Sequence, residues 1–184
     1  MRILALDQSY KRTGIALLEG QSTLLDLASI EFSKSGTKLE PWQKRELVAT
    51  LVQSWCKKYK PDYVVVERVR LFSSYQRKSK ETVYGQQVET NEPGISVPTI
   101  IALAKLNGAI VNAARACGIP VYSIDTKQWK DALLSRIPGK DKKDKATSVW
   151  YIQQVFSITA DHDAAEAACI ALASHNQNLL KEET

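Results

Sequence analysis

Ile3-Leu-Ala-Leu-Asp-Gln-Ser9, with Thr13-Gly14 shortly after it, is the stretch that decides the fold expected of this chain. It is an apolar run that ends abruptly in an acid, which is typical of a buried strand that carries Asp7 to the edge of a sheet. Residues 13–19 and 24–32 have the pattern of two further strands separated by short polar turns. The three segments together predict an antiparallel meander.

Helices and apolar strands alternate after this meander. Pro41 opens a helix, and Tyr63-Val-Val-Val66 is a short strand that ends in Glu67. A second long helix is expected over residues 99–117, then a fifth strand over residues 120–124, and then three helices: one after Asp125 or Thr126, one over residues 142–156, and a last one that begins at Asp161 or Asp163. This order resembles the RNase H-like fold of the α/β class, which implies a five-stranded mixed sheet in the order 3-2-1-4-5 flanked by helices.

Residues 73–98 differ from the rest of the chain. They are polar, contain Gly85, Pro93, Gly94 and Pro98, and show no sustained period. A segment of this length without recognisable structure is usually functional or mobile.

The composition is that of one ordinary globular domain, and we expect residues 1–184 to form it. The apolar runs look shorter than a bilayer span, and the N-terminus does not resemble a signal peptide. The three cysteines, Cys56, Cys117 and Cys169, form no CxxC pair, so neither a zinc site nor a disulfide framework is indicated. A reducing cytoplasm is the expected location.

The net charge of +5 is concentrated in two segments. Residues 68–80 hold five basic residues and no acid, and residues 127–145 hold seven basic residues against three acids. Such segments suit a polyanionic partner whose counterions are released on binding, although they are equally compatible with a solvated surface.

Two acids are expected to meet at one edge of the sheet. Asp7 ends the first strand and Glu67 ends the fourth, and the carboxyl ends of neighbouring parallel strands share one crevice. Two carboxylates so placed repel each other unless a cation joins them, and a hard divalent ion with oxygen ligands does so. Each acid also has a simpler interpretation: Asp7 as a turn residue, and Glu67 as a partner of Arg68 or Arg70.

The last helix supplies a second pair of acids. Asp163 and Glu166 are three residues apart, so they lie on one helix face, and the alanines around them allow close approach to the sheet. In the alternative interpretation Asp161 or Asp163 is a helix cap, with Glu166 completing a capping box.

These motifs resemble those of the RuvC-type Holliday junction resolvases. The similarity is carried by residues 3–9 with Thr13-Gly14, by Val65-Val-Glu-Arg-Val69, by Asp163-Ala-Ala-Glu-Ala167 and by the loop Gly139–Lys145. It implies that Asp7, Glu67, Asp163 and Glu166 bind metal and that Lys145 and Lys130 lie near the scissile phosphate. Glu166 stands where the family usually has aspartate, Arg70 stands where it often has an aromatic wedge, and residues 73–98 suggest a divergent or phage-type member.

The resemblance implies an endodeoxyribonuclease of DNA recombination and repair that nicks four-way junctions symmetrically through two-metal hydrolysis. The implied cofactor is Mg²⁺, two ions per site with Mn²⁺ as a substitute. The implied assembly is a homodimer, with the helix over residues 99–117 as candidate interface. The expected DNA-binding residues are Arg68, Arg70, Phe72, Tyr75, Arg77, Lys78, Lys80, Lys130, Lys142 and Lys143.

Two other functions are compatible with the motifs. One is a nuclease of the same fold that acts on RNA or on flaps, and the other is a branched-DNA-binding module without catalytic activity. Actin-like ATPases share the opening strand and acid, but they need two such domains and the chain has room for one.

Overall fold

The computed structural model describes residues 1–9, 11–32, 39–69, 76–83, 86–93, 97–135 and 137–183. Its main sheet has the strand order β3-β2-β1-β4-β7-β8. The first three strands form the predicted antiparallel meander, β1 (Arg2–Gln8), β2 (Arg12–Glu19) and β3 (Thr23–Glu31). The parallel strands are β4 (Tyr63–Glu67) and β7 (Val121–Ile124).

The predicted order of the first five strands is confirmed, but the count of five is wrong. A sixth strand, β8 (Lys181–Glu182), pairs antiparallel with β7 near the C-terminus. Two residues are too few to produce a period in the sequence, so this edge strand could be found only from its pairing.

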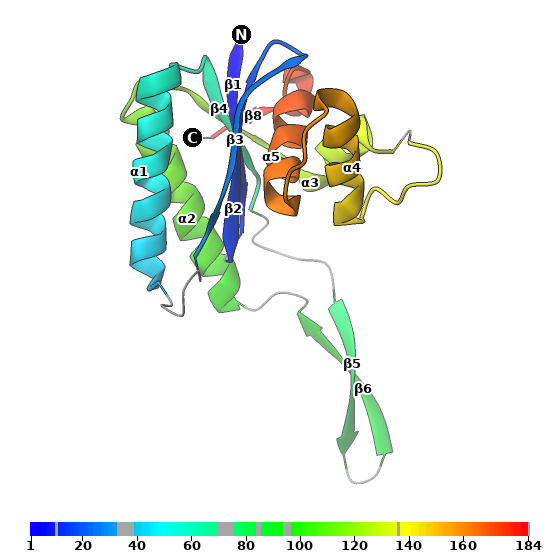
Figure 1. Cartoon of the computed structure of the whole chain (residues 1–184). Helices are drawn as coiled ribbons and strands as arrows, with labels where there is room; N and C mark the ends of the chain where they lie inside the picture. Colours follow the sequence, from blue (N-terminus) through cyan, green and yellow to red (C-terminus); the bar gives the residue numbers. More distant parts are fainter. Residues whose placement is uncertain are drawn as a thin grey trace.

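Helices cover both faces of the sheet (Figure 1). One face packs against α1 (Pro41–Tyr59) and α2 (Val97–Arg115). The other packs against α5 (His162–Ala173), with α3 (Thr126–Leu133) and α4 (Lys145–Phe156) beside it. Because side chains alternate along a strand, β1 sends Leu4 and Leu6 to the first core and Ile3 and Ala5 to the second.

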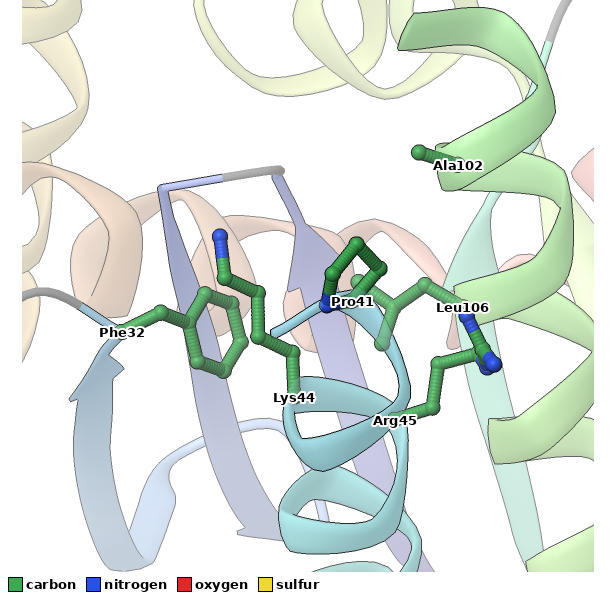
Figure 2. Close-up of a pocket in the computed structure, with 6 residues that line it drawn as sticks. All are labelled: Phe32, Pro41, Lys44, Arg45, Ala102 and Leu106. Atoms are coloured by element: carbon green, nitrogen blue, oxygen red, sulfur yellow. The ribbon is translucent and has the colours of Figure 1, made fainter. Parts of the chain in front are cut away.

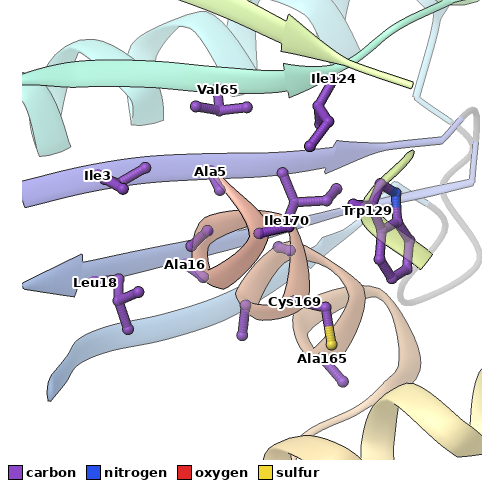
Figure 3. Packing of buried hydrophobic residues seen from close by; sticks show 14 of the residues in the cluster. Ile3, Ala5, Ala16, Leu18, Val65, Ile124, Trp129, Ala165, Cys169 and Ile170 are labelled. Carbon is purple, nitrogen blue, oxygen red and sulfur yellow. The ribbon is translucent and has the colours of Figure 1, made fainter. Parts of the chain in front are cut away.

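Helix α5 lies closest to the sheet. Its buried residues are mostly alanines, and Figure 3 shows Ala165, Cys169 and Ile170 between the strands and the neighbouring helix. Small side chains bring the two backbones together, so the first turn of α5 reaches the edge of the sheet where β1 and β4 end.

Part of the segment expected to lack regular structure forms a hairpin. Strands β5 (Gln76–Val83) and β6 (Gln86–Pro93) pair antiparallel as a separate two-stranded ribbon that extends away from the main sheet (Figure 1). The register sets Arg77 opposite Glu92 and Lys80 opposite Glu89. Both strands have polar sequences, so no alternation of apolar residues predicted them.

Helix α2 also departs from expectation. By length and composition it is apolar enough to cross a membrane, contrary to the impression given by the shorter apolar runs. A core helix of a globular protein passes the same test, so this observation is weak evidence for a membrane. Part of α2 packs on α1 and the sheet through Leu106, Ile110 and Ala114.

Candidate metal centre

Two acids meet where neighbouring parallel strands end. The β1–β4 register pairs Leu6 with Val66, which puts Asp7 and Glu67 side by side one residue further on. Asp7 has the same strand parity as Ile3 and Ala5, so it faces α5. The Thr126 hydroxyl, in the first turn of α3, donates to Glu67 Oε1, and it fixes this carboxylate from the next strand-to-helix connection.

The first turn of α5 brings the other two acids. Asp161 is the helix N-cap and accepts a hydrogen bond from the Ala164 amide at 2.9 Å, which leaves Asp163 and Glu166 free of any capping role. Asp163 and Glu166 are 9% and 5% exposed. Carboxylate oxygens of Asp7, Asp163 and Glu166 lie within 4.8 Å of one another. These three residues, from two distant segments, therefore form one group of closely spaced oxygens, and Glu67 lies beside Asp7 at the end of a third segment; we call the four residues the acid cluster.

Gly14 makes this approach possible. A Cβ atom at residue 14 would lie 2.0 Å from the Asp163 carbonyl oxygen and 2.8 Å from the Ala164 nitrogen. Only glycine lets β2 pass so close to the backbone of α5, so the Thr13-Gly14 motif determines where Asp163 stands.

Among the residues that the structure describes, three basic side chains contact the acids of α5. Lys145 Nζ lies 3.3 Å from both Asp163 Oδ1 and Glu166 Oε2. Lys130 Nζ lies 2.9 Å from Glu166 Oε1, and Arg12 Nε lies 3.6 Å from Asp163 Oδ2. Lys130 also stacks on the Trp129 ring, and Arg12 is held from its other side by Glu31.

Burial and mutual repulsion perturb the acids at the strand ends. Burial, followed by the charges of Glu67 and Glu166, raises the pKa of Asp7 well above its ordinary value. Burial also raises the pKa of Glu67, although the hydrogen bonds from Thr126 and Asp7 oppose that shift. Carboxyls with raised pKa values and closely spaced hard oxygen atoms fit a divalent cation, which would remove the repulsion between them.

The expected DNA-binding residues are placed less uniformly. Arg68 donates to Ser123 Oγ at 2.8 Å and pairs with Asp125, and Lys142 pairs with Asp131. Lys143 is exposed in the loop before α4. Arg77, Lys78 and Lys80 lie on β5, which is described by its backbone, whereas Arg70, Phe72 and Tyr75 lie outside the described residues.

Sequence reasoning missed three side chains that support the cluster. These are Arg12, Thr126, and Gln8, whose amide donates to the Glu67 carbonyl oxygen at 2.5 Å. Thr126 had a usable signal, because polar residues directly after the fifth strand must reach the same sheet edge as Asp7 and Glu67. Arg12 had none, since its contact depends on how closely α5 packs.

A small cavity lies elsewhere, between α1, α2 and the end of β3. Figure 2 shows its lining, which comprises Phe32, Pro41, Lys44, Arg45, Ala102 and Leu106. Phe32 and Leu106 belong to the core on the α1–α2 face. The cavity is therefore on the other side of the sheet from the acid cluster, and none of the described residues that line it carries a carboxylate.

Comparison with curated proteins gives relatives described as crossover junction endodeoxyribonucleases. No protein-family model matches the chain. The chain is 25% identical over 172 residues to the crossover junction endodeoxyribonuclease RuvC of Syntrophomonas wolfei subsp. wolfei. This alignment covers 94% of this chain and 87% of that protein. It is 26% identical over 178 residues to the RuvC of Pseudarthrobacter chlorophenolicus, covering 94% of this chain and 78% of that protein.

Solved structures share the fold. The complex of Thermus thermophilus RuvC with a Holliday junction substrate superposes with a TM-score of 0.71 and 16% identity, covering 100% of this chain and 99% of that one. The yeast mitochondrial Holliday junction resolvase gives a TM-score of 0.57 at 13% identity, covering 96% and 82%. These matches confirm the predicted fold class, and together with the curated relatives they confirm the resemblance seen in the motifs.

Proposed function

We propose that this chain, a RuvC-type protein by sequence and fold, is an endonuclease that resolves four-way DNA junctions by paired symmetric nicks. The observation that carries the proposal is the convergence of Asp7, Glu67, Asp163 and Glu166, from three separate segments, on one buried site at the carboxyl edge of the sheet. Acids gathered against their own repulsion are typical of a metal site for phosphoryl chemistry.

We propose that the acid cluster would hold two Mg²⁺ ions, for which Mn²⁺ would substitute. Asp7 lies between Glu67 on one side and the α5 acids on the other, so it is the residue that would contact both ions. When bound, such ions supply an activated water and stabilise the leaving oxygen. The protein contributes Lys145 and Lys130, whose ammonium groups lie at the cluster and would neutralise charge on the phosphate.

DNA would approach along the basic side chains around the cluster. Lys143 is exposed and Lys142 half-buried in the loop that leads to Lys145, and β5 brings further basic residues on the ribbon. Arg70, Phe72 and Tyr75 remain candidates for contact with unpaired bases. Arg77 and Lys80 stand opposite glutamates in the ribbon. We therefore expect the ribbon to help position the DNA more than to attract it by net positive charge.

Paired nicks require two active sites, so we propose a homodimer with two-fold symmetry. Its interface would lie on the α1–α2 side. Val97 and Ile101 are four residues apart on α2 and are 62% and 49% exposed, and Trp42 and Leu47 on α1 are also exposed. Apolar side chains of this size left uncovered on adjacent helices favour burial against a second copy. The free cysteines support a cytoplasmic location.

The decisive experiment offers the purified protein with Mg²⁺ four substrates: a four-way junction, a flap, a linear duplex and an RNA–DNA hybrid. We expect paired nicks in the junction in preference to the other substrates. If the protein cuts only the hybrid or only the flap, that molecule and not the four-way junction is its substrate. Binding of the junction with no cutting in Mg²⁺ or Mn²⁺ would favour a non-catalytic module.

Asp7→Asn is the matched test of the site. Loss of a metal-contacting carboxylate should lower the cutting rate by at least about 100-fold, since even outer-shell changes at metal sites cost about 10–100-fold. Junction binding should remain. Asp62→Asn is the control, because Asp62 is an exposed acid at the opposite end of the sheet, beside the N-terminus. Undiminished cutting by Asp7→Asn would remove Asp7 from the site.

A further inference from the structure

The charges of the acid cluster are compensated unevenly. Asp163 and Glu166 share three basic partners, Arg12, Lys130 and Lys145. Within the described part of the chain, no lysine or arginine forms an ion pair with Asp7 or Glu67, which hydrogen bond to each other instead. The α5 side of the cluster is therefore already neutralised by the protein, and the strand side is not.

Lys145 has the central position among the three basic residues. Its ammonium bridges Asp163 and Glu166 at 3.3 Å from each, and these two acids with Asp7 are the three whose oxygens lie within 4.8 Å. A cation that holds both carboxylates stands where a divalent ion on that side would have to bind. The acids in turn hold the ammonium: burial lowers the pKa of Lys145, but the charges of Glu166, Asp163 and Asp7 outweigh burial and raise it.

Lys145 is also the partner best able to leave. Its side chain is 55% exposed, and it is the first residue of α4, directly after an exposed loop. Lys130 differs, because its side chain is only 17% exposed and rests on Trp129. Arg12 is fixed between Glu31 and Asp163. Withdrawal of Lys145 would therefore leave both α5 acids held in place by other partners.

We propose that Lys145 is an exchangeable occupant of the acid cluster. In the DNA-free protein its ammonium holds Asp163 and Glu166 and keeps a divalent ion from the α5 side. A DNA phosphate then draws the ammonium away and opens that side to a second ion. This inference rests on the proposed nuclease function, since a phosphate beside the cluster is what moves Lys145.

The exchange couples metal loading to substrate binding. An ammonium and a divalent ion compete for the same two carboxylates, so whatever attracts the ammonium elsewhere strengthens binding of the ion. By linkage, the ion must strengthen binding of DNA by the same factor. On the strand side, no ammonium of the described residues forms an ion pair with Asp7 or Glu67, so we expect that side to load without DNA.

Titration of the DNA-free protein with Mn²⁺, followed by calorimetry or electron paramagnetic resonance, tests the proposal without any cutting. We expect wild type to bind one ion tightly. Lys145→Met should bind a second ion at least about tenfold more tightly than wild type, a factor within the usual range for coupled sites. Lys145→Arg should resemble wild type because it retains a cation.

Lys140→Met is the matched control. It removes one positive charge from the same loop, and Lys140 contacts the Trp150 ring and not an acid of the cluster. Equal Mn²⁺ binding by wild type and Lys145→Met would overturn the proposal, and so would the same gain in Lys140→Met. Thermal unfolding of each variant without metal verifies that it is folded.

A second titration contains a four-way junction, with Ca²⁺ in place of Mn²⁺ and a gel to verify that the DNA is uncut. DNA should then raise the number of tightly bound ions in wild type but not in Lys145→Met. If the DNA-free Mn²⁺ result holds and no junction is ever cut, the exchange stands and the proposed function fails. If junctions are cut but Lys145→Met binds Mn²⁺ as wild type does, the exchange alone fails.

Discussion

Gly14 couples the chain's opening motif to the position of a residue almost 150 positions further on. Its missing side chain lets the Asp163 carbonyl lie where a Cβ would be, 2.0 Å from that atom's ideal position. No rotamer change can relieve such a clash, because the position of a Cβ is fixed by its own backbone and the atoms that it meets are backbone atoms. The strand or the helix would have to move.

Gly14→Ala should therefore displace the first turn of α5 and with it Asp163. We expect destabilisation of about 1–3 kcal/mol, the usual range for an overpacked core, and a loss of Mn²⁺ affinity that exceeds what lower stability explains. Gly108→Ala is the control, because a Cβ there meets no atom within 4 Å and alanine favours a helix by about 0.5–1 kcal/mol. Unaltered Mn²⁺ binding in Gly14→Ala would show that α5 accommodates the methyl group.

The raised pKa values of Asp7 and Glu67 predict how stability depends on pH. Both carboxyls bind protons more tightly in the folded state than in the unfolded chain, where they titrate near 3.8 and 4.5. The unfolded chain therefore loses its protons first as pH rises. The free energy of unfolding of the metal-free protein then falls, until the pH passes the raised values.

Mg²⁺ should reverse this loss, so the gain in Tm on adding Mg²⁺ should grow as the pH rises above the unfolded values of 3.8 and 4.5, until the raised values are passed. Each ~1 kcal/mol gained corresponds to about 2–4 °C for a chain of this size. Asp7→Asn provides the baseline, because it removes one of the two carboxyls whose pKa is raised. The pKa of Asp161 shifts in the opposite direction: burial alone would raise it, but hydrogen bonds from Ala164 and Ser29 lower it. We expect Asp7→Asn to be more stable than wild type without metal at pH 7; a lower Tm would contradict the assignment.

At the scale of elements, the strands and helices that could be predicted from the sequence are those whose side chains pack in a hydrophobic core. Strands β1, β2 and β4 are buried on both faces, so their residues form the short apolar runs that made them visible, and helix α5 is buried along most of its length. The meeting of Asp7 and Glu67 followed from the strand order, and the pairing of Asp163 with Glu166 followed from their spacing on one helix face. Strand β8 has two exposed residues, and the strands of the β5–β6 ribbon are polar and pair outside the main sheet, so neither shows an apolar run or period.

The ribbon's independence gives a prediction of its own. Its strands pair with each other and with no strand of the main sheet. Replacing residues 76–93 by a short Gly-Ser linker should therefore change the Tm by less than about 2 °C, because a two-stranded ribbon adds little stability by itself. Junction cutting should fall while Mn²⁺ binding is retained. A large drop in Tm would show instead that the ribbon supports the body.

For the whole molecule, the two faces of the sheet carry different features. The α5 face holds the acid cluster, and the α1–α2 face carries the large exposed apolar side chains Trp42, Leu47, Val97 and Ile101. Dimerisation through the second face would leave both acid clusters open to DNA. The order of the layers is thus compatible with two cuts made by one assembly.

Ile101→Glu tests this arrangement. A charge placed in an apolar interface should raise the dimer dissociation constant by at least about tenfold, the equivalent of ~1.4 kcal/mol, which sedimentation velocity over a range of concentrations would measure. Val155→Glu is the control, because Val155 is a comparably exposed apolar residue on α4, outside the α1–α2 face. In Ile101→Glu, nicks should become independent, so that singly nicked junctions accumulate while each remaining site still binds Mn²⁺. If Ile101→Glu sediments as wild type does and still cuts in pairs, the interface lies elsewhere, and α2 owes its exposed residues to something other than a second copy.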